Sequence, residues 1–89
     1  MSETTPRRYI LTLTCPDRTG IVAAVGSFIA SHGGLISQAA QHGDALHNRF
    51  YMRVEIQADT LPFYLDEFRE RFTPVARQFE MEWGISDSS

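Results

Sequence analysis

The apolar residues of this chain switch between the two-residue period of a strand and the 3.6-residue period of a helix in a definite order. A strand pattern comes first, carried by Tyr9, Leu11, Leu13 and Cys15. A helical stripe follows, formed by Ile21, Val22, Val25, Phe28 and Ile29. Each period places its apolar side chains on one face of the element, so the order of the periods predicts the order of strands and helices.

The remainder of the chain continues this pattern with two strands, a helix and a last strand. A second strand is predicted over residues 35–42, with a hairpin turn at 43–46. The third strand has the clearest alternation, with one face formed by Phe50, Met52, Val54 and Ile56. Thr19 and the pair Gly33-Gly34 are the expected cap and stop of the first helix.

A second helix is predicted to begin beside Pro62, capped by Asp59 or Thr60, and to end at Pro74. Its buried stripe would consist of Leu61, Leu65, Phe68 and Phe72. The last strand is expected to bury Phe79, Met81 and Trp83. The resulting order β-α-β-β-α-β is that of a ferredoxin-like sandwich of the α+β class, a four-stranded antiparallel sheet with two helices on one face.

The length leaves room for one domain only, because 89 residues bury a single small core. We assign residues 8–85 to this domain, 1–7 to a disordered N-terminal tail and 86–89 to a polar tail. A net charge of −3 argues against a nucleic-acid partner, and no apolar run is long enough for a membrane span. A single cysteine and no signal peptide indicate a cytoplasmic protein.

The predicted second strand has an unusual edge. It carries no Asp, Glu, Lys, Arg or Pro between residues 35 and 43, although natural edge strands usually use charge or proline to block further pairing. We therefore expect a homodimer that pairs the second strands of two copies. The open face of the sheet is predicted to be polar, and either solvent or a neighbouring domain or subunit would cover it.

Residues that carry chemistry are scarce. There is no nucleophile–base arrangement, phosphate-cradling glycine motif or zinc spacing, so we expect no catalytic residues, no metal and no cofactor in this chain. His42 and His47 flank the predicted hairpin turn but lack a third ligand. Cys15 shares the inward face of the first strand and is interpreted as a small core residue.

The junction between the first strand and the first helix remains as a candidate site. A helix that begins after Gly20 directs backbone N–H groups and the positive end of its dipole at the turn, which suits a small carboxylate. The same residues also suit a purely structural turn, in which Asp17 forms an Asx turn and Arg18 is solvated. The residues alone leave both interpretations open.

Two segments resemble a known family. Residues 15–22, with the sequence CPDRTGIV, and then Gly34, Leu35, Ile36 and Gln38, are similar to the ACT domain, a small-molecule-sensing module. The third strand, NRFYMRVE at residues 48–55, resembles the ACT region of the formyltetrahydrofolate deformylase family. That resemblance implies a regulatory domain attached to a catalytic domain that hydrolyses 10-formyltetrahydrofolate to formate and tetrahydrofolate for purine and one-carbon metabolism.

The resemblance also implies an effector site between two protomers. One protomer would supply its turn and the other the start of its second strand, and the residues are Asp17, Arg18, Thr19, Gly20, Ile21, Leu35, Ile36, Ser37 and Gln38. Glycine and methionine are the first effectors to consider. Two alternatives stay open: a stand-alone ACT regulator of the glycine-cleavage type that acts through protein contacts, and an RNA-recognition-type domain with the same element order.

Overall fold

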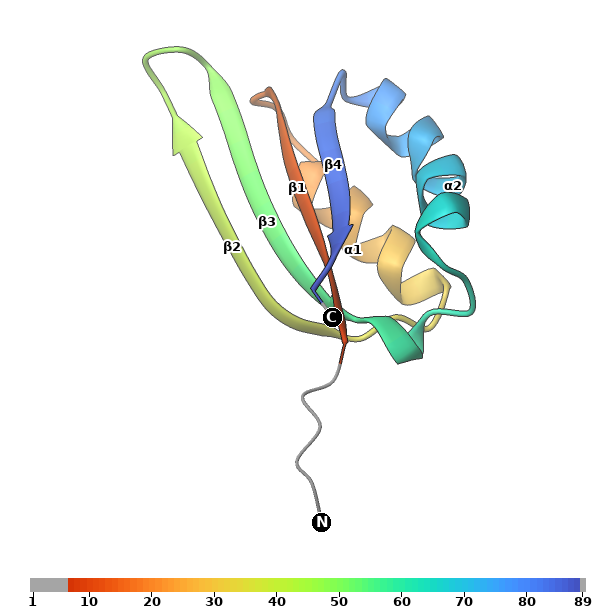
Figure 1. The fold of residues 1–89 in the computed structure, drawn as a ribbon. Coiled ribbons are helices and arrows are strands. Elements are labelled where there is room, and N and C mark those ends of the chain that lie inside the picture. The colour runs from red at the N-terminus through yellow and green to blue at the C-terminus, as the bar shows by residue number, and fades with distance from the viewer. Residues whose placement is uncertain (1–6, 89) are drawn as a thin grey trace.

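The computed structural model describes residues 7–88, which form one α+β sandwich (Figure 1). The strands are β1 (Arg8–Pro16), β2 (Ile36–Asp44), β3 (Arg49–Gln57) and β4 (Glu82–Asp87). The helices are α1 (Ile21–Ser31), the short 3-10 helix η1 (Ala58–Thr60) and α2 (Leu65–Gln78). This order confirms the predicted ferredoxin-like β-α-β-β-α-β arrangement.

The sheet is antiparallel throughout and has the order β2-β3-β1-β4. The two long helices lie on one face of it, and β2 stands at one edge with its outer side unpaired among the described residues (Figure 1). The central strands are β1 and β3 and the edge strands are β2 and β4, so the second strand is at an edge as predicted. No helix within residues 7–88 is long and apolar enough to cross a membrane.

The core lies between the sheet and the two helices. The inward residues of β1 and β3 are buried at every second position, and they pack against the apolar stripes of α1 and α2. Side chains that are almost completely buried include Tyr9, Leu11, Val25, Ile29, Val54, Ile56, Phe68 and Phe72. Burial of each large apolar side chain stabilises the fold by about 1.5–3 kcal/mol, which is why the alternating pattern predicts this layer well.

The ends of α1 differ in part from the prediction. Gly20, not Thr19, is the N-cap; it has a φ of 93°, and no side chain of the described residues caps the helix. At the other end Gly33 adopts a φ of 79°, which only glycine adopts readily. Gly34 allows a close approach, because a Cβ there would lie 2.8 Å from side-chain atoms of both Ile29 and Leu61.

The predicted bounds of α2 are wrong at both ends. The helix begins at Leu65 rather than near Pro62, because residues 58–60 form a separate 3-10 turn that closes with a bond from Thr60 Oγ1 to the Gln57 carbonyl (2.6 Å). The helix also passes through Pro74. Proline removes one helical hydrogen bond, but burial of Ala76 beyond it keeps the last turn packed on the sheet.

The last strand and the hairpin turn are also shifted along the chain. Phe79 is the C-cap of α2 rather than a strand residue, and β4 begins at Glu82 and continues to Asp87. Ser86 and Asp87, which we assigned to the polar tail, pair with β1, and Asp87 is held by an ion pair with Arg7. Residues 1–6 and 89 of the predicted tails lie outside the described residues.

The hairpin turn between β2 and β3 occupies residues 45–48, two residues later than predicted. Gly43 and Asp44 are the last residues of β2. The Asp44 carboxylate accepts backbone N–H bonds from Leu46 (3.1 Å) and His47 (3.3 Å), so the aspartate closes the turn from its first position.

Candidate functional site

The turn between β1 and α1 leaves the start of the helix open. Gly20 has no neighbouring heavy atom within 4 Å of where a Cβ would stand, so its backbone is accessible. Within the described residues, α1 has neither a side-chain cap nor an acidic residue in its first turn. The positive end of the helix dipole is thus not compensated by the protein, and a small anion would be stabilised there.

Asp17 and Arg18 are positioned by different parts of the fold. The backbone N–H of Asp17 donates to the Asn48 carbonyl (2.9 Å), which ties the turn to the start of β3. The Arg18 guanidinium lies 5.1 Å from the ring centroid of Phe79, and its Nη1 lies 3.5 Å from the Gln78 carbonyl. Arg18 therefore contacts the end of α2. The interpretation of the turn as purely structural predicts instead that this side chain is solvated.

The second predicted segment, residues 35–38, lies at the start of β2 and is exposed. The backbone N–H of Leu35 donates to Thr60 Oγ1 (2.9 Å), which fixes the entry to the strand. A bulge between Ile36 and Gln38 leaves Ser37 outside the ladder, and its Oγ donates to the Glu55 carbonyl (3.2 Å). The edge of β2 thus carries one bulge at its beginning and is regular from Gln38 to Asp44.

The two segments lie at opposite ends of the sheet in one protomer. β1 and β2 both run from the lower to the upper end in Figure 1, so the turn after β1 is at the top and residues 35–38 are at the bottom. A strand of this length spans about 30 Å at about 3.3 Å per residue. One chain therefore does not bring Asp17, Thr19, Gly20 and Ile21 together with residues 35–38.

The far end of β2, in contrast, lies beside the turn. A Cβ built on Gly43 would stand 3.7 Å from the Asp17 carboxylate oxygen Oδ2. The Asp17 side chain is exposed and faces this end of the strand. No pattern in the sequence signals this contact, because it depends on how β1, β3 and β2 are ordered in the sheet.

The contacts of the other candidate residues indicate a structural role. Cys15 is fully buried, and burial raises the pKa of its thiol, so it is a core residue rather than a nucleophile. His47 Nδ1 lies 2.8 Å from the Asp44 carboxylate, and this bond holds the pKa of Asp44 below its usual value. Within residues 7–88 no three metal-ligating side chains cluster.

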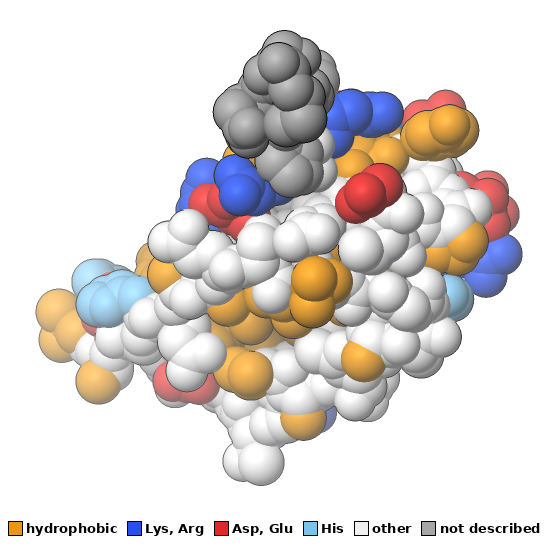
Figure 2. Space-filling view, turned by 90° about the horizontal axis from the view of Figure 1, so that it is seen from below, with side chains coloured by type: hydrophobic (Ala, Val, Ile, Leu, Met, Phe, Trp, Pro, Cys, Tyr) orange, Lys and Arg blue, Asp and Glu red, His pale blue; other side chains and the backbone are white. Residues whose placement is uncertain are grey.

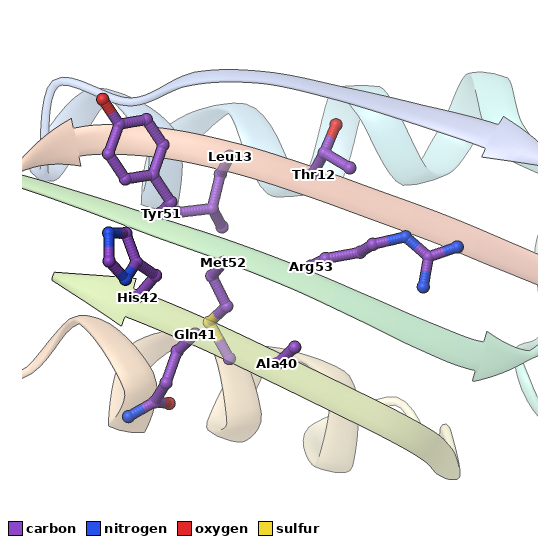
Figure 3. A pocket seen from close by; sticks show the side chains of 8 residues that line it. All are labelled: Thr12, Leu13, Ala40, Gln41, His42, Tyr51, Met52 and Arg53. Carbon is purple, nitrogen blue, oxygen red and sulfur yellow. The ribbon is translucent and has the colours of Figure 1, made fainter.

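A feature that sequence reasoning missed is a shallow depression of about 340 Å³ on the open face of the sheet (Figure 3). It is lined by Thr12, Leu13, Ala40, Gln41, His42, Tyr51, Met52 and Arg53. The small side chains of Thr12 on β1 and Ala40 on β2 lie on either side of Arg53 on β3, and only the register of the strands brings them into one row. Alternation along one strand cannot reveal such a hollow.

Comparison with known proteins places these observations in a family, although no family model matches the chain. A formyltetrahydrofolate deformylase of Corynebacterium sp. (strain P-1) is 38% identical over 80 residues, which make up 90% of this chain and 28% of that protein. The deformylase of Bacillus subtilis (strain 168) is 32% identical over 80 residues. The chain spans about 28% of the length of these curated relatives.

Solved structures show the same similarity to deformylases. A formyltetrahydrofolate deformylase from Pseudomonas syringae pv. tomato superposes with a TM-score of 0.94 at 55% identity, over 96% of this chain and 28% of that one. An ACT domain protein from Streptococcus pneumoniae has a TM-score of 0.79 at 23% identity and shows the shared fold.

The sheet order β2-β3-β1-β4 with the helices on one face is the ferredoxin-like fold that this protein shares with ACT domains. Its homologues, at 32–55% identity over most of its length, are named formyltetrahydrofolate deformylase. The chain belongs to the ACT domains of that family.

Proposed function

We propose that this chain is the effector-sensing, dimerising domain of a cytoplasmic formyltetrahydrofolate deformylase. The complete enzyme would hydrolyse 10-formyltetrahydrofolate to formate and tetrahydrofolate, and this domain would regulate the reaction without contributing catalytic residues. The observation that carries the proposal is the open, uncapped start of α1, together with Asp17 of the preceding turn beside Gly43 near the end of β2. The homology to deformylases supplies the reaction.

A dimer through β2 would complete the site. If two β2 strands pair antiparallel, the start of the partner's strand lies beside the Gly43 end of the first strand. Gly43 is next to Asp17, so the pairing would bring residues 35–38 of the partner to the turn at residues 17–21. Two identical sites per dimer follow from the two-fold symmetry.

The surface around this edge suits a second copy. All of β2 up to Asp44 is exposed, and it presents unpaired backbone groups along one side. The exposed part of α1 carries only uncharged side chains, among them Val22, Ala23 and Ala30. Viewed from the end where β2 begins, hydrophobic and uncharged groups fill the middle of the surface and charged groups lie mainly at its margins (Figure 2).

The effector class follows from the groups available. The backbone N–H groups of Gly20 and Ile21 would bind a carboxylate, and the exposed Asp17 carboxylate would bind an ammonium group. Gln38 of the partner would orient either group, while Arg18 and Thr19 complete the turn. A free α-amino acid carries both charges, and glycine and methionine are the first candidates.

Calorimetry of the chain with glycine, methionine and serine tests the site. Asp17→Asn removes a charge-assisted bond worth about 1.5–3 kcal/mol, so we expect affinity to fall about 10- to 100-fold. Asp59→Asn makes the same charge change on η1 and should bind as the wild type does. Absence of heat from all three amino acids, or equal binding by the Asp17 variant, would refute the assignment.

A second experiment tests the dependence on a dimer. Ala39→Lys places lysines close together across the paired edges, and sedimentation should show a monomer because like charges oppose pairing. Calorimetry of the same variant should show no effector binding. Glu70→Gln, an exposed change on α2 that shifts the charge by the same amount, should leave both properties unchanged. A monomeric Ala39 variant that still binds the effector would contradict the shared site.

A stand-alone regulator is the second candidate function. It is favoured by the ACT domain protein of Streptococcus pneumoniae, of which this chain covers 92%. The length of the gene product decides between the two. A native protein of about this length would favour the stand-alone regulator, whereas a protein of the deformylases' length that hydrolyses 10-formyltetrahydrofolate would favour the enzyme domain.

A further inference from the structure

The open face of the sheet, opposite the helices, is hollowed across its middle. One row in register across the strands consists of Ala40, Arg53, Thr12 and Gly84, and the next row consists of His42, Tyr51, Thr14 and Glu82. Three members of the first row are small. They leave two depressions of about 340 and about 310 Å³ that share Thr12, Leu13 and Tyr51. We call the two together the central trough.

Figure 3 shows how the larger part of the trough is bounded. Thr12 on β1 and Ala40 on β2 flank Arg53 on β3, and the rings of Tyr51 and His42 lie together at one end, with centroids 6.1 Å apart. Tyr51 remains 41% exposed, which is a large exposed aromatic surface for the middle of a sheet. Interfaces are enriched in such tyrosines at their cores.

The three arginines of this face lie close to two glutamates. Arg53 Nη1 lies 2.6 Å from a Glu55 carboxylate oxygen, and Arg8 Nε lies 3.7 Å from the other. At the end of the trough where Tyr51 and His42 lie, Arg49 Nη2 lies 3.9 Å from a Glu82 carboxylate oxygen. Arg8 and Arg53 thus share one carboxylate, so the part of the face around Glu55 keeps a net positive charge. A covering surface with a carboxylate opposite these arginines would complement it.

Three other surfaces already have solvent or a partner assigned to them. The outer side of α2 carries the pairs Asp66–Arg69 and Glu67–Arg71, which belong in water. In the proposed function, the edge of β2 and the exposed side of α1 contact a second copy. The open face is a large surface to which the proposed function assigns no partner.

We propose that the central trough is the surface on which the catalytic region of the same enzyme docks. This rests on the proposed function, in which the chain is one domain of a longer deformylase. The curated relatives are more than three times as long as the matched segment, so a large region lies outside it. Ser88 hydrogen-bonds through both its N–H and its Oγ to the Arg8 carbonyl, so the chain leaves β4 at the margin of this face.

The location also provides a route for regulation. Ala40 is the middle residue of β2, and it lines the trough on the same strand whose edge would pair with the second copy. A change in how two β2 strands pair would therefore alter the docking surface directly. Effector binding at the dimer interface reaches the catalytic region through this strand, without a change in the core.

The test compares thiol labelling in the 89-residue chain and in the complete protein encoded by its gene. Thr12→Cys places a thiol in the trough, and Gln78→Cys places one on the exposed side of α2 as a matched control. The native Cys15 is fully buried and stays unlabelled in the folded protein. We expect maleimide to label the Thr12 variant about tenfold or more slowly in the complete protein, because docking covers the site. The Gln78 variant should react equally in both.

A photo-crosslinker on the Thr12→Cys thiol identifies what covers the trough. Crosslinks to the region beyond this domain support the proposal. Equal labelling of the Thr12 variant in both proteins, or crosslinks to another copy of residues 7–88, would overturn it. Hydrolysis of 10-formyltetrahydrofolate is measured in the same preparation. Activity together with equal labelling overturns docking alone, whereas a protein without this activity overturns the proposed function and docking with it.

Discussion

Two glycines offer a sharp test of the packing around α1, because alanine should act in opposite directions at them. At Gly34 a Cβ would lie 2.8 Å from Ile29 Cγ2, 2.8 Å from Leu61 Cδ2 and 3.1 Å from the Ile29 carbonyl oxygen. At Gly26, inside α1, nothing lies within 4 Å of the corresponding position. Neither glycine has a positive φ, so the comparison is one of space and helix propensity alone.

The magnitudes follow from these distances. Carbon atoms pack best at about 3.5–4.0 Å, so the Gly34→Ala methyl overlaps two buried side chains by about 1 Å. Ile29 is branched and fully buried, and its carbonyl belongs to the helix backbone, so neither moves easily. Overpacking of this kind costs about 1–3 kcal/mol. Gly26→Ala should instead stabilise the domain by about 0.5–1 kcal/mol.

Urea unfolding followed by circular dichroism is the assay, with all proteins at one protomer concentration because dimerisation shifts apparent stability. With an m-value of about 1 kcal/mol/M, the Gly34 variant should lose about 1–3 M in its midpoint. The thermal midpoint should fall by about 4–8 °C for each kcal/mol. A Gly34 variant as stable as the wild type, or two variants that shift in the same direction, would refute the packing argument.

Two further predictions concern α2 and the hairpin turn. Pro74→Ala restores a helical hydrogen bond and should raise stability by about 1–2 kcal/mol, measured by thermal unfolding; a lower melting temperature would show that proline fits this turn. Asp44→Asn removes the carboxylate whose pKa the His47 side chain lowers. A carboxylate with a depressed folded pKa stabilises the protein above its unfolded pKa of about 3.9 and loses this effect as the pH falls through the folded value. The variant should therefore be less stable than the wild type at pH 5, and the difference should shrink below pH 4; a constant difference would contradict this.

The fold was predictable because each face of each element is either buried or exposed over its whole length. The alternation at Phe50, Met52 and Val54 survives in the structure without a shift, since one step of register would expose all of them. The bounds of α2 were less predictable. A proline signals a helix end locally, but burial on both sides of Pro74 outweighed it.

The candidate site was predictable only in part. Sequence spacing located a helix start after Gly20, although it assigned the cap to Thr19, whose side chain makes no capping bond. It could not show that Arg18 would lie over Phe79, a contact between residues that are 61 positions apart. Contacts of this kind depend on how distant segments are arranged in the fold. The periodicity of a single strand does not reveal the order of the strands in the sheet.

The sequence by itself determined the layers, the inward side of each strand and helix, and the position of the turn before α1, because the period of burial and the conformation of glycine are local properties. Only the tertiary structure decided which residues meet. It placed Asp17 beside Gly43, separated the turn from residues 35–38 by the length of β2, and brought Thr12, Ala40 and Gly84 into one row. These relations arise from the pairing of strands distant in the chain, and pairing minimises the free energy of the whole sheet rather than that of any one segment.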